Sequence, residues 1–299
     1  MVDNLVDKIK QLKEEKNAVI LGHNYQREEI LDVSDFIGDS LELAKKALET
    51  EAKIIVFCGV DFMAESAKIL NPEKMVLHPE KLSICPMAAM ATPEKILEVK
   101  KKYPKAAVMS YINTSAAVKA VSDICCTSAN SVKVANSLTE DAIIFAPDKN
   151  LAAYTQTKTT KKIIPFDGHC YVHDKITAES VRKAKEIHPL AKVMVHPECP
   201  MEVIREADAV CSTAQMIKYA KESDASEYIA VTECGMANVL KRIMPAKTFY
   251  AAGGTCIQMK KITLDKVYNC LLNETNQVEI PKDIMANAKK ALERMIKVS

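Results

Sequence analysis

The chain has 299 residues, a length that suits one large domain or two to three small ones with buried cores. Its composition is 48% hydrophobic and 27% charged, and its formal net charge is +2. This near-neutral balance gives no electrostatic argument for binding nucleic acid or an anionic membrane. The chain contains no Trp and few aromatic residues on which bases could stack. We therefore expect neither nucleic acid nor membrane as a partner.

The N-terminal segment and the cysteines bear on the cellular compartment. No apolar run approaches the roughly 20 residues of a membrane-spanning helix. Residues 1–16 are charged throughout and lack the apolar core of a signal peptide. These features predict a cytoplasmic protein. In that compartment, ten cysteines favour metal binding or catalysis over disulfides.

Taken in chain order, the predicted elements repeat three times. Each unit is expected to run helix, strand, polar loop, helix, strand, helix, strand and cysteine loop. The three strands of each unit are predicted at Ala18–His23, Lys53–Phe57 and Lys74–His78, at Ala107–Tyr111, Ala142–Phe145 and Lys161–Pro165, and at Lys192–His196, Tyr228–Val231 and Lys247–Tyr250. Short apolar strands alternating with helices are typical of parallel sheets buried on both faces.

Three cysteines keep the same period. Cys85 and Cys170 are 85 residues apart, and Cys170 and Cys256 are 86 apart. Seven residues after each cysteine comes a threonine, followed two residues later by an acid, which is typical of a helix start. The threonines are Thr92, Thr177 and Thr263. We place the units at 1–85, 86–171 and 172–257. Residues 258–299 add two amphipathic helices, near 263–273 and 281–297, that pack on the repeats.

Polar residues follow the predicted strands at equivalent positions in all three units. The first strands end in the ring residues His23, Tyr111 and His196, and the second strands are followed by the acids Asp61, Asp148 and Glu233. Between them lie loops that begin at Asp35, Asp123 and Asp208 and end in the hydroxyl residues Ser40, Ser128 and Thr213. Ligands of parallel sheets bind outside the carboxyl ends of the strands. If the units surround a pseudo-threefold axis, these loops form one pocket.

Three thiolates around one axis favour a shared metal centre. Cys85, Cys170 and Cys256 lie in loops, beside proline or glycine residues that let backbone approach a bulky group. A [4Fe–4S] cluster on three cysteines would leave one iron open to act as a Lewis acid. Zinc bound by the same three cysteines is the alternative.

A set of seven motifs occurs in order along essentially the whole chain. They are His23-Asn-Tyr-Gln26, Gly38-Asp-Ser40, Cys85-Pro-Met-Ala88, Cys126-Thr-Ser-Ala-Asn130, Gly168-His-Cys170, His196-Pro-Glu-Cys-Pro200 and Met259-Lys-Lys261. Each motif alone is weakly specific, but the ordered set resembles the quinolinate synthase family.

The resemblance implies a fold, a cofactor and a reaction. The fold would be three homologous αβα units with short parallel sheets around a pseudo-threefold axis. A [4Fe–4S] cluster would be held by Cys85, Cys170 and Cys256. The enzyme, a transferase, would condense iminoaspartate with dihydroxyacetone phosphate to quinolinate in de novo NAD synthesis, losing phosphate and two waters. An upstream aspartate oxidase or dehydrogenase would supply the iminoaspartate.

The resemblance also implies roles for individual residues. The catalytic groups would be His23, Tyr25, His196 and Glu198. Of these, His23, His196 and Glu198 would also contact substrate. The other substrate-binding residues would be Ser40, Tyr111, Asn113, Ser128 and Thr213. His169, His173 and His188 are interpreted as structural. Two other functions stay open: another iron–sulfur hydro-lyase acting on a different dicarboxylate, and a non-catalytic iron–sulfur or zinc protein.

Overall fold

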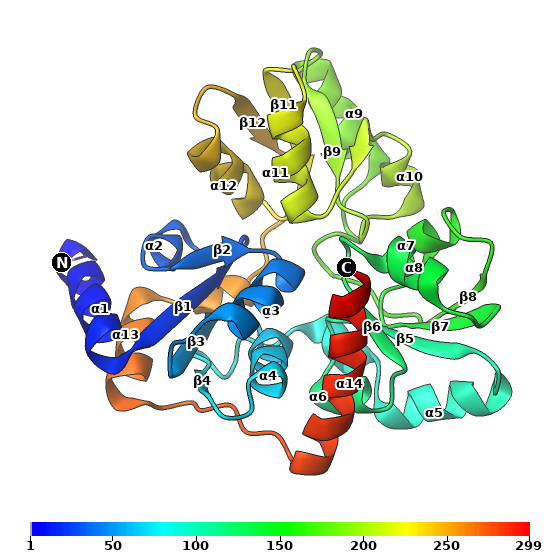
Figure 1. The fold of residues 1–299 in the computed structure, drawn as a ribbon. Coiled ribbons are helices and arrows are strands. Elements are labelled where there is room, and N and C mark those ends of the chain that lie inside the picture. The colour runs from blue at the N-terminus through cyan, green and yellow to red at the C-terminus, as the bar shows by residue number, and fades with distance from the viewer. Residues whose placement is uncertain (1) are drawn as a thin grey trace.

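The computed structural model describes residues 2–299, which form three four-stranded sheets with helices on their faces. All strand pairs of the three sheets are parallel, and each sheet has the same strand order, 2-1-3-4 in the numbering of its own unit. Figure 1 shows the three sheets and their helices grouped around the centre of the molecule. We call these groups units 1, 2 and 3. The predicted α/β fold class with three similar units is confirmed.

Unit 1 is the group labelled α1–α4 and β1–β4 in Figure 1, drawn from dark to light blue. Its helices are α1 (Val2–Lys16), α2 (Glu28–Leu31), α3 (Ser40–Glu49) and α4 (Asp61–Leu70), and its strands are β1 (Ala18–His23), β2 (Phe36–Gly38), β3 (Ile54–Cys58) and β4 (Met75–Leu77).

Unit 2 starts with a short 3₁₀ helix, η1 (Pro86–Met90). Its α-helices are α5 (Pro93–Lys102), α6 (Ala116–Ala120), α7 (Ser131–Ser137) and α8 (Lys149–Gln156), and its strands are β5 (Ala107–Tyr111), β6 (Ile124–Cys126), β7 (Ala142–Ala146) and β8 (Lys162–Pro165).

Unit 3 and the C-terminal segment complete the chain. The helices of unit 3 are α9 (Ala178–Ile187), α10 (Met201–Ile204), α11 (Thr213–Glu222) and α12 (Gly235–Ile243), and its strands are β9 (Lys192–Val195), β10 (Ala209–Val210), β11 (Glu227–Val231) and β12 (Thr248–Ala251). After them come η2 (Met259–Lys261), α13 (Leu264–Asn273) and α14 (Lys282–Val298).

Each unit has one strand more than the sequence analysis predicted. The additional strands, β2, β6 and β10, lie at an edge of their sheets inside the expected polar loops. They are only two or three residues long, which is too short for a recognisable strand pattern. The unit boundaries at residues 85, 171 and 257 stay a prediction.

The central strands are buried because helices cover both faces of each sheet. Every residue of β3 and β5 is buried, which explains their uninterrupted apolar sequences. The predicted helix starts at the three threonines are also observed. The side chains of Thr92 and Thr177 accept hydrogen bonds from backbone N–H groups of α5 and α9, whereas Thr263 starts α13 without such a bond.

An aspartate fixes the first strand of each unit to the loop that follows it. The carboxylates of Asp35, Asp123 and Asp208 accept the backbone N–H groups of Ile20, Val108 and Val193 at 2.7, 2.8 and 2.8 Å. The backbone N–H of each aspartate returns a hydrogen bond to the carbonyl of the same strand residue. The repeat therefore extends to individual hydrogen bonds.

The two C-terminal helices pack on different parts of the repeats. Helix α13 lies against α1 and β3 of unit 1, and α14 contacts α4 of unit 1 together with α6 and β6 of unit 2. Figure 1 shows α14, in red, between these two units. Both helices lie where the sequence predicts them.

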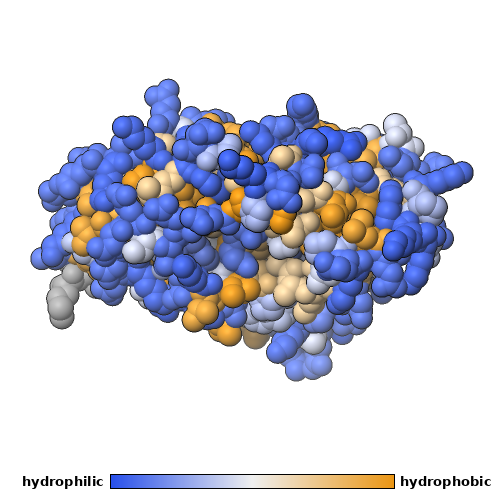
Figure 2. All heavy atoms as spheres, turned by 90° about the horizontal axis from the view of Figure 1, so that it is seen from below, coloured by the Kyte–Doolittle hydropathy of each residue, from blue (hydrophilic) through white to orange (hydrophobic). Residues whose placement is uncertain are grey.

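The surface is mainly hydrophilic, although small apolar areas interrupt it. Figure 2 shows charged and polar residues over most of one face, with apolar residues gathered near its lower edge. Among residues 2–299, no helix is both long enough and apolar enough to cross a bilayer.

Replacing one of the three loop aspartates should destabilise the protein. Asp208→Ala leaves the N–H of buried Val193 without its acceptor, so we expect the free energy of unfolding to fall by about 1–3 kcal/mol. Urea denaturation followed by circular dichroism measures this loss. The exposed Asp224 is the matched control, since Asp224→Ala should change stability by less than about 0.5 kcal/mol. Equal stability of the two variants would contradict the prediction.

Candidate functional site

One cavity lies where the three units meet. Its wall contains every residue for which the sequence and the family resemblance suggested a functional role. These are His23, Tyr25, Ser40, Cys85, Tyr111, Asn113, Ser128, Cys170, His196, Glu198, Thr213 and Cys256. They come from all three units and follow the carboxyl ends of strands, where parallel sheets bind ligands. The geometry places these residues together; their individual roles stay predictions.

In each unit the ring residue is followed, two positions later, by a second side chain that lines the cavity. His23 ends β1 and is followed by Tyr25, Tyr111 ends β5 and is followed by Asn113, and His196 follows β9 and precedes Glu198. In units 1 and 3 the histidine Nδ1 accepts the backbone N–H of residue i+2, at 3.1 and 3.3 Å. This turn directs both side chains toward the cavity.

The two histidines are uncharged at neutral pH. Burial, supported by the nearby Lys260 ammonium, lowers the pKa of His23 to about 3. Burial and the neighbouring His173 ring lower the pKa of His196 to about 3. Because Nδ1 of each ring accepts a hydrogen bond, the proton lies on Nε2. Each imidazole can therefore donate one hydrogen bond from Nε2.

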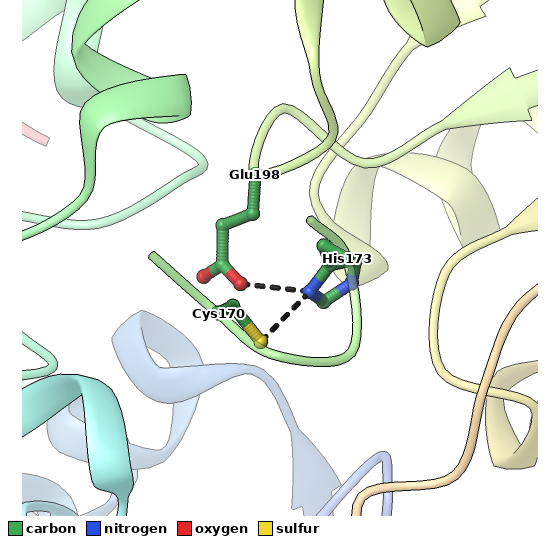
Figure 3. Close-up of side chains that lie close together, drawn as sticks. All are labelled: Cys170, His173 and Glu198. Carbon is green, nitrogen blue, oxygen red and sulfur yellow. Dashed lines mark hydrogen bonds and ion pairs between the residues drawn. The ribbon is translucent and has the colours of Figure 1, made fainter. Parts of the chain in front are cut away.

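Glu198 is the centre of a buried polar cluster, drawn in Figure 3 with Cys170 and His173. Its carboxylate lies 2.8 Å from His173 Nδ1 and also accepts a hydrogen bond from the Tyr111 hydroxyl. His173 Nδ1 is 3.2 Å from the Cys170 sulfur. Burial alone would raise the pKa of Glu198, but His173, His196 and Tyr111 lower it, so the carboxylate is charged. The ligand atoms of Cys170, His173 and Glu198 lie within 4.8 Å of one another and fit metal binding.

A line of hydrogen bonds links this cluster to Tyr25. Nε2 of His173 is 2.8 Å from the Thr232 hydroxyl, which is 2.6 Å from the Tyr25 hydroxyl. Thr232 is fully buried directly after β11, so no water competes for these bonds. Nδ1 of His173 faces a carboxylate and a sulfur and carries the proton. With the proton on Nδ1, Nε2 can accept from the Thr232 hydroxyl, whose oxygen can accept from Tyr25.

Two of the three hydroxyl residues that the sequence placed in the cavity start ten-residue helices. Ser40 and Thr213 are the first residues of α3 and α11, whose N-caps Asp39 and Ser212 form capping boxes. Ser128 instead lies in the loop three residues before α7. Asn24 of unit 1 donates from Nδ2 to the Thr213 hydroxyl at 2.8 Å, which holds unit 3 against unit 1.

The cysteines suit a common metal group. Cys85, Cys170 and Cys256 line the same cavity from equivalent loops, and all ten cysteines, each within residues 2–299, are free thiols. Burial raises the pKa of the Cys85 thiol to about 12, and it also raises the pKa of Cys170 and Cys256. A bound cationic group would favour their thiolate forms. The donor set therefore fits an iron–sulfur cluster.

Sequence reasoning missed three residues of this site. His173 was interpreted as structural, although its position three residues after Cys170 was a usable signal. Lys260 lies in the Met259-Lys-Lys261 motif, but no role was assigned to it, and Thr232 had no signal because its contact with Tyr25 crosses between units. The Lys260 ammonium donates to the Tyr25 carbonyl at 2.5 Å and lies 3.2 Å from Glu233.

The fold and the cavity together define a threefold-repeated α/β protein with one cysteine-lined central site. Comparison with known proteins identifies the family. A family model described as quinolinate synthetase A protein matches residues 7–297. "Quinolinate synthase" of Thermococcus kodakarensis is 51% identical over 301 residues, covering 99% of this chain and 99% of that protein.

Two further relatives also have names that describe them as quinolinate synthases. "Quinolinate synthase 1" of Methanosarcina acetivorans is 50% identical, covering 99% of this chain and 98% of the relative. "Quinolinate synthase" of Methanocaldococcus jannaschii is 49% identical, covering 99% of each chain. The chain belongs to the quinolinate synthase family, and it is an enzyme.

The Thr232 hydroxyl should be needed for full turnover. Thr232→Val keeps the side-chain shape but removes the hydrogen bonds to Tyr25 and His173, so we expect kcat to fall about tenfold with little change in KM. Thr232→Ser restores the hydroxyl and should recover most of the rate. Steady-state kinetics of both variants test this.

Thr155 provides the control for the Thr232 variants. It is another fully buried threonine, bonded to the Leu151 carbonyl outside the cavity, and Thr155→Val should keep wild-type turnover. Wild-type kcat in Thr232→Val would contradict the predicted role.

Proposed function

We propose that this protein is a quinolinate synthase. It condenses iminoaspartate with dihydroxyacetone phosphate and releases phosphate and two waters, as a transferase in NAD biosynthesis. The observation that carries the proposal is the convergence, on one cavity wall, of three cysteines and nine further residues to which the family resemblance assigns roles. The near-full-length similarity to proteins named quinolinate synthase supports it. An upstream enzyme that oxidises aspartate supplies the unstable iminoaspartate.

Anionic substrates require donors that remain available in the cavity. Iminoaspartate carries two carboxylates and dihydroxyacetone phosphate carries a phosphate. The N-termini of α3 and α11 present Ser40 and Thr213, together with backbone N–H groups that favour anions. Ser128 adds a hydroxyl group from unit 2, next to Tyr111, whose own O–H donates to Glu198. Asn113 lines the same wall, and its Nδ2 group can donate to a substrate carboxylate, while its buried Oδ1, which makes no hydrogen bond within residues 2–299, can accept one from substrate.

The condensation moves protons at several steps, and the cavity contains groups suited to this. Nε2–H of His23 and of His196 can donate to a carbonyl or hydroxyl oxygen of substrate. Tyr25 and Glu198 are the other two proton-transfer groups, and Thr232 and His173 connect them. The protein can thus donate a proton from unit 1 and accept one in unit 3.

Cys85, Cys170 and Cys256 would hold a [4Fe–4S] cluster. When bound through three cysteines, such a cluster supplies a Lewis-acidic iron with one open coordination position. The equivalent loops and the N–H groups around the cysteines fit this role. Zinc on the same three ligands stays the alternative that metal analysis decides.

Removing any of the three cysteines should abolish both cluster and activity. In anaerobically reconstituted Cys170→Ala we expect loss of the brown absorbance and no quinolinate from oxaloacetate, ammonia and dihydroxyacetone phosphate. Cys211→Ala and Cys270→Ala remove thiols outside the cavity and should keep both properties. Retention of the cluster in Cys170→Ala, or wild-type protein without quinolinate formation, would refute the assignment.

Ser128 should contribute to substrate affinity. Ser128→Ala removes one cavity hydroxyl, so we expect KM for a substrate to rise about tenfold while the cluster absorbance is unchanged. Thr177→Ala removes a hydroxyl that only caps α9, and its KM should equal that of the wild type. An unchanged KM in Ser128→Ala would exclude a role for this hydroxyl in binding.

A further inference from the structure

Three acids noted in the sequence have no part in the proposed reaction. Asp61, Asp148 and Glu233 follow the third strand of units 1, 2 and 3, and we call them the anchoring acids. Asp148 and Glu233 are almost completely buried. Burial of a carboxylate is costly unless its oxygens accept hydrogen bonds, so their partners indicate what they do.

In two units the partner of the anchoring acid is the cysteine itself. Asp61 Oδ1 accepts the backbone N–H of Cys85 at 3.0 Å. Glu233 Oε1 accepts the backbone N–H of Cys256 at 3.1 Å. The acid and its cysteine are 24 residues apart in unit 1 and 23 in unit 3. Equivalent acids thus make the same contact in two units.

In unit 2 the acid makes a different contact. Asp148 uses Oδ1 to accept the N–H of Leu151 at 2.7 Å, as the N-cap of α8. Its other oxygen, Oδ2, is buried and makes no hydrogen bond within residues 2–299. The acid-to-cysteine hydrogen bond is therefore found in units 1 and 3 and not in unit 2.

A second hydrogen bond accompanies each anchoring acid. The backbone N–H of Asp61, Lys149 or Cys234 donates to the carbonyl two residues before the cysteine, at 2.9, 2.8 and 3.0 Å. In units 1 and 3 two hydrogen bonds thus join the cysteine loop to the segment that carries the acid, and in unit 2 one does. Such attachment fixes the cysteine backbone and with it the direction of the sulfur.

Glu233 has a further connection, to unit 1. It pairs with Lys260, whose ammonium donates to the Tyr25 carbonyl and lies 3.3 Å from the Gln26 carbonyl. The Cys256 loop and the Tyr25 segment are therefore held by one carboxylate. A displaced Glu233 would disturb both the cysteine and the proton-transfer side of the cavity.

We propose that two of the anchoring acids, Asp61 and Glu233, are positioning residues that hold the Cys85 and Cys256 loops in the geometry that retains the cluster. The proposal rests on the cluster assigned under the proposed function. Hydrogen-bond partners behind metal ligands orient those ligands, and their loss typically weakens metal binding about 10- to 100-fold. The two acids act through the peptide N–H groups of the cysteines.

The test measures iron loss rather than turnover. Wild-type protein, Asp61→Ala and Glu233→Ala are reconstituted anaerobically with iron and sulfide and then mixed with a ferrous chelator, and absorbance follows iron release. We expect release about tenfold faster in both variants. Asp61→Asn and Glu233→Gln keep an acceptor oxygen and should accelerate release only about threefold.

Asp123→Ala is the matched control. It removes a carboxylate that accepts the backbone N–H of Val108 at 2.8 Å, between α6 and β6, and that makes no hydrogen bond to Cys85, Cys170 or Cys256. We expect wild-type iron release from it. Equal release in wild type and Asp61→Ala or Glu233→Ala overturns the proposal, as does equal acceleration in Asp123→Ala.

The result separates this proposal from the cluster assignment. If wild-type protein binds no iron–sulfur cluster, the proposed function fails. If it binds one and the alanine variants release iron no faster, only the role of the anchoring acids fails. Should an alanine variant not fold, Asp61→Asn and Glu233→Gln still decide, because wild-type release rates in both would refute the proposal.

Discussion

Parallel strand pairing is the constraint on which the rest of the structure depends. Within each sheet all carboxyl ends point the same way, so the loops after β1, β3 and β4 of unit 1, and their equivalents, emerge on one side. Three units with this geometry face one another and enclose a single cavity. Residues that follow strands therefore face the cavity, and all the functional residues suggested by the sequence are among them.

Burial of this cavity determines its electrostatics. His23 and His196 are uncharged because desolvation outweighs the nearby Glu198 carboxylate. Glu198 is charged because neighbouring donors offset the same desolvation. Two neutral donors and one anion therefore lie close together, and Glu198 keeps its charge against desolvation because of its neighbours. Tyr111 and His173 are two of those neighbours.

Much of the fold could be predicted from sequence because repetition supplied independent copies of each signal. Strands β1 and β5 have the predicted bounds, since their apolar runs are bordered by polar residues. Strand β10 could not be predicted, because two residues carry no periodicity. Individual contacts between units could not be predicted from the sequence either. Asn24 and Thr213, for example, are 189 residues apart, and no sequence pattern relates them.

Because one polypeptide carries all three units, equivalent positions of the units can hold different side chains. Three identical units would have to offer three identical side chains at every equivalent position of a threefold site. Here one polypeptide carries all three units, so position i+2 after the ring residue can be Tyr25, Asn113 or Glu198. The cysteines and anchoring acids keep the symmetry while the cavity wall has lost it. A symmetric scaffold can in this way surround a ligand that has no symmetry of its own.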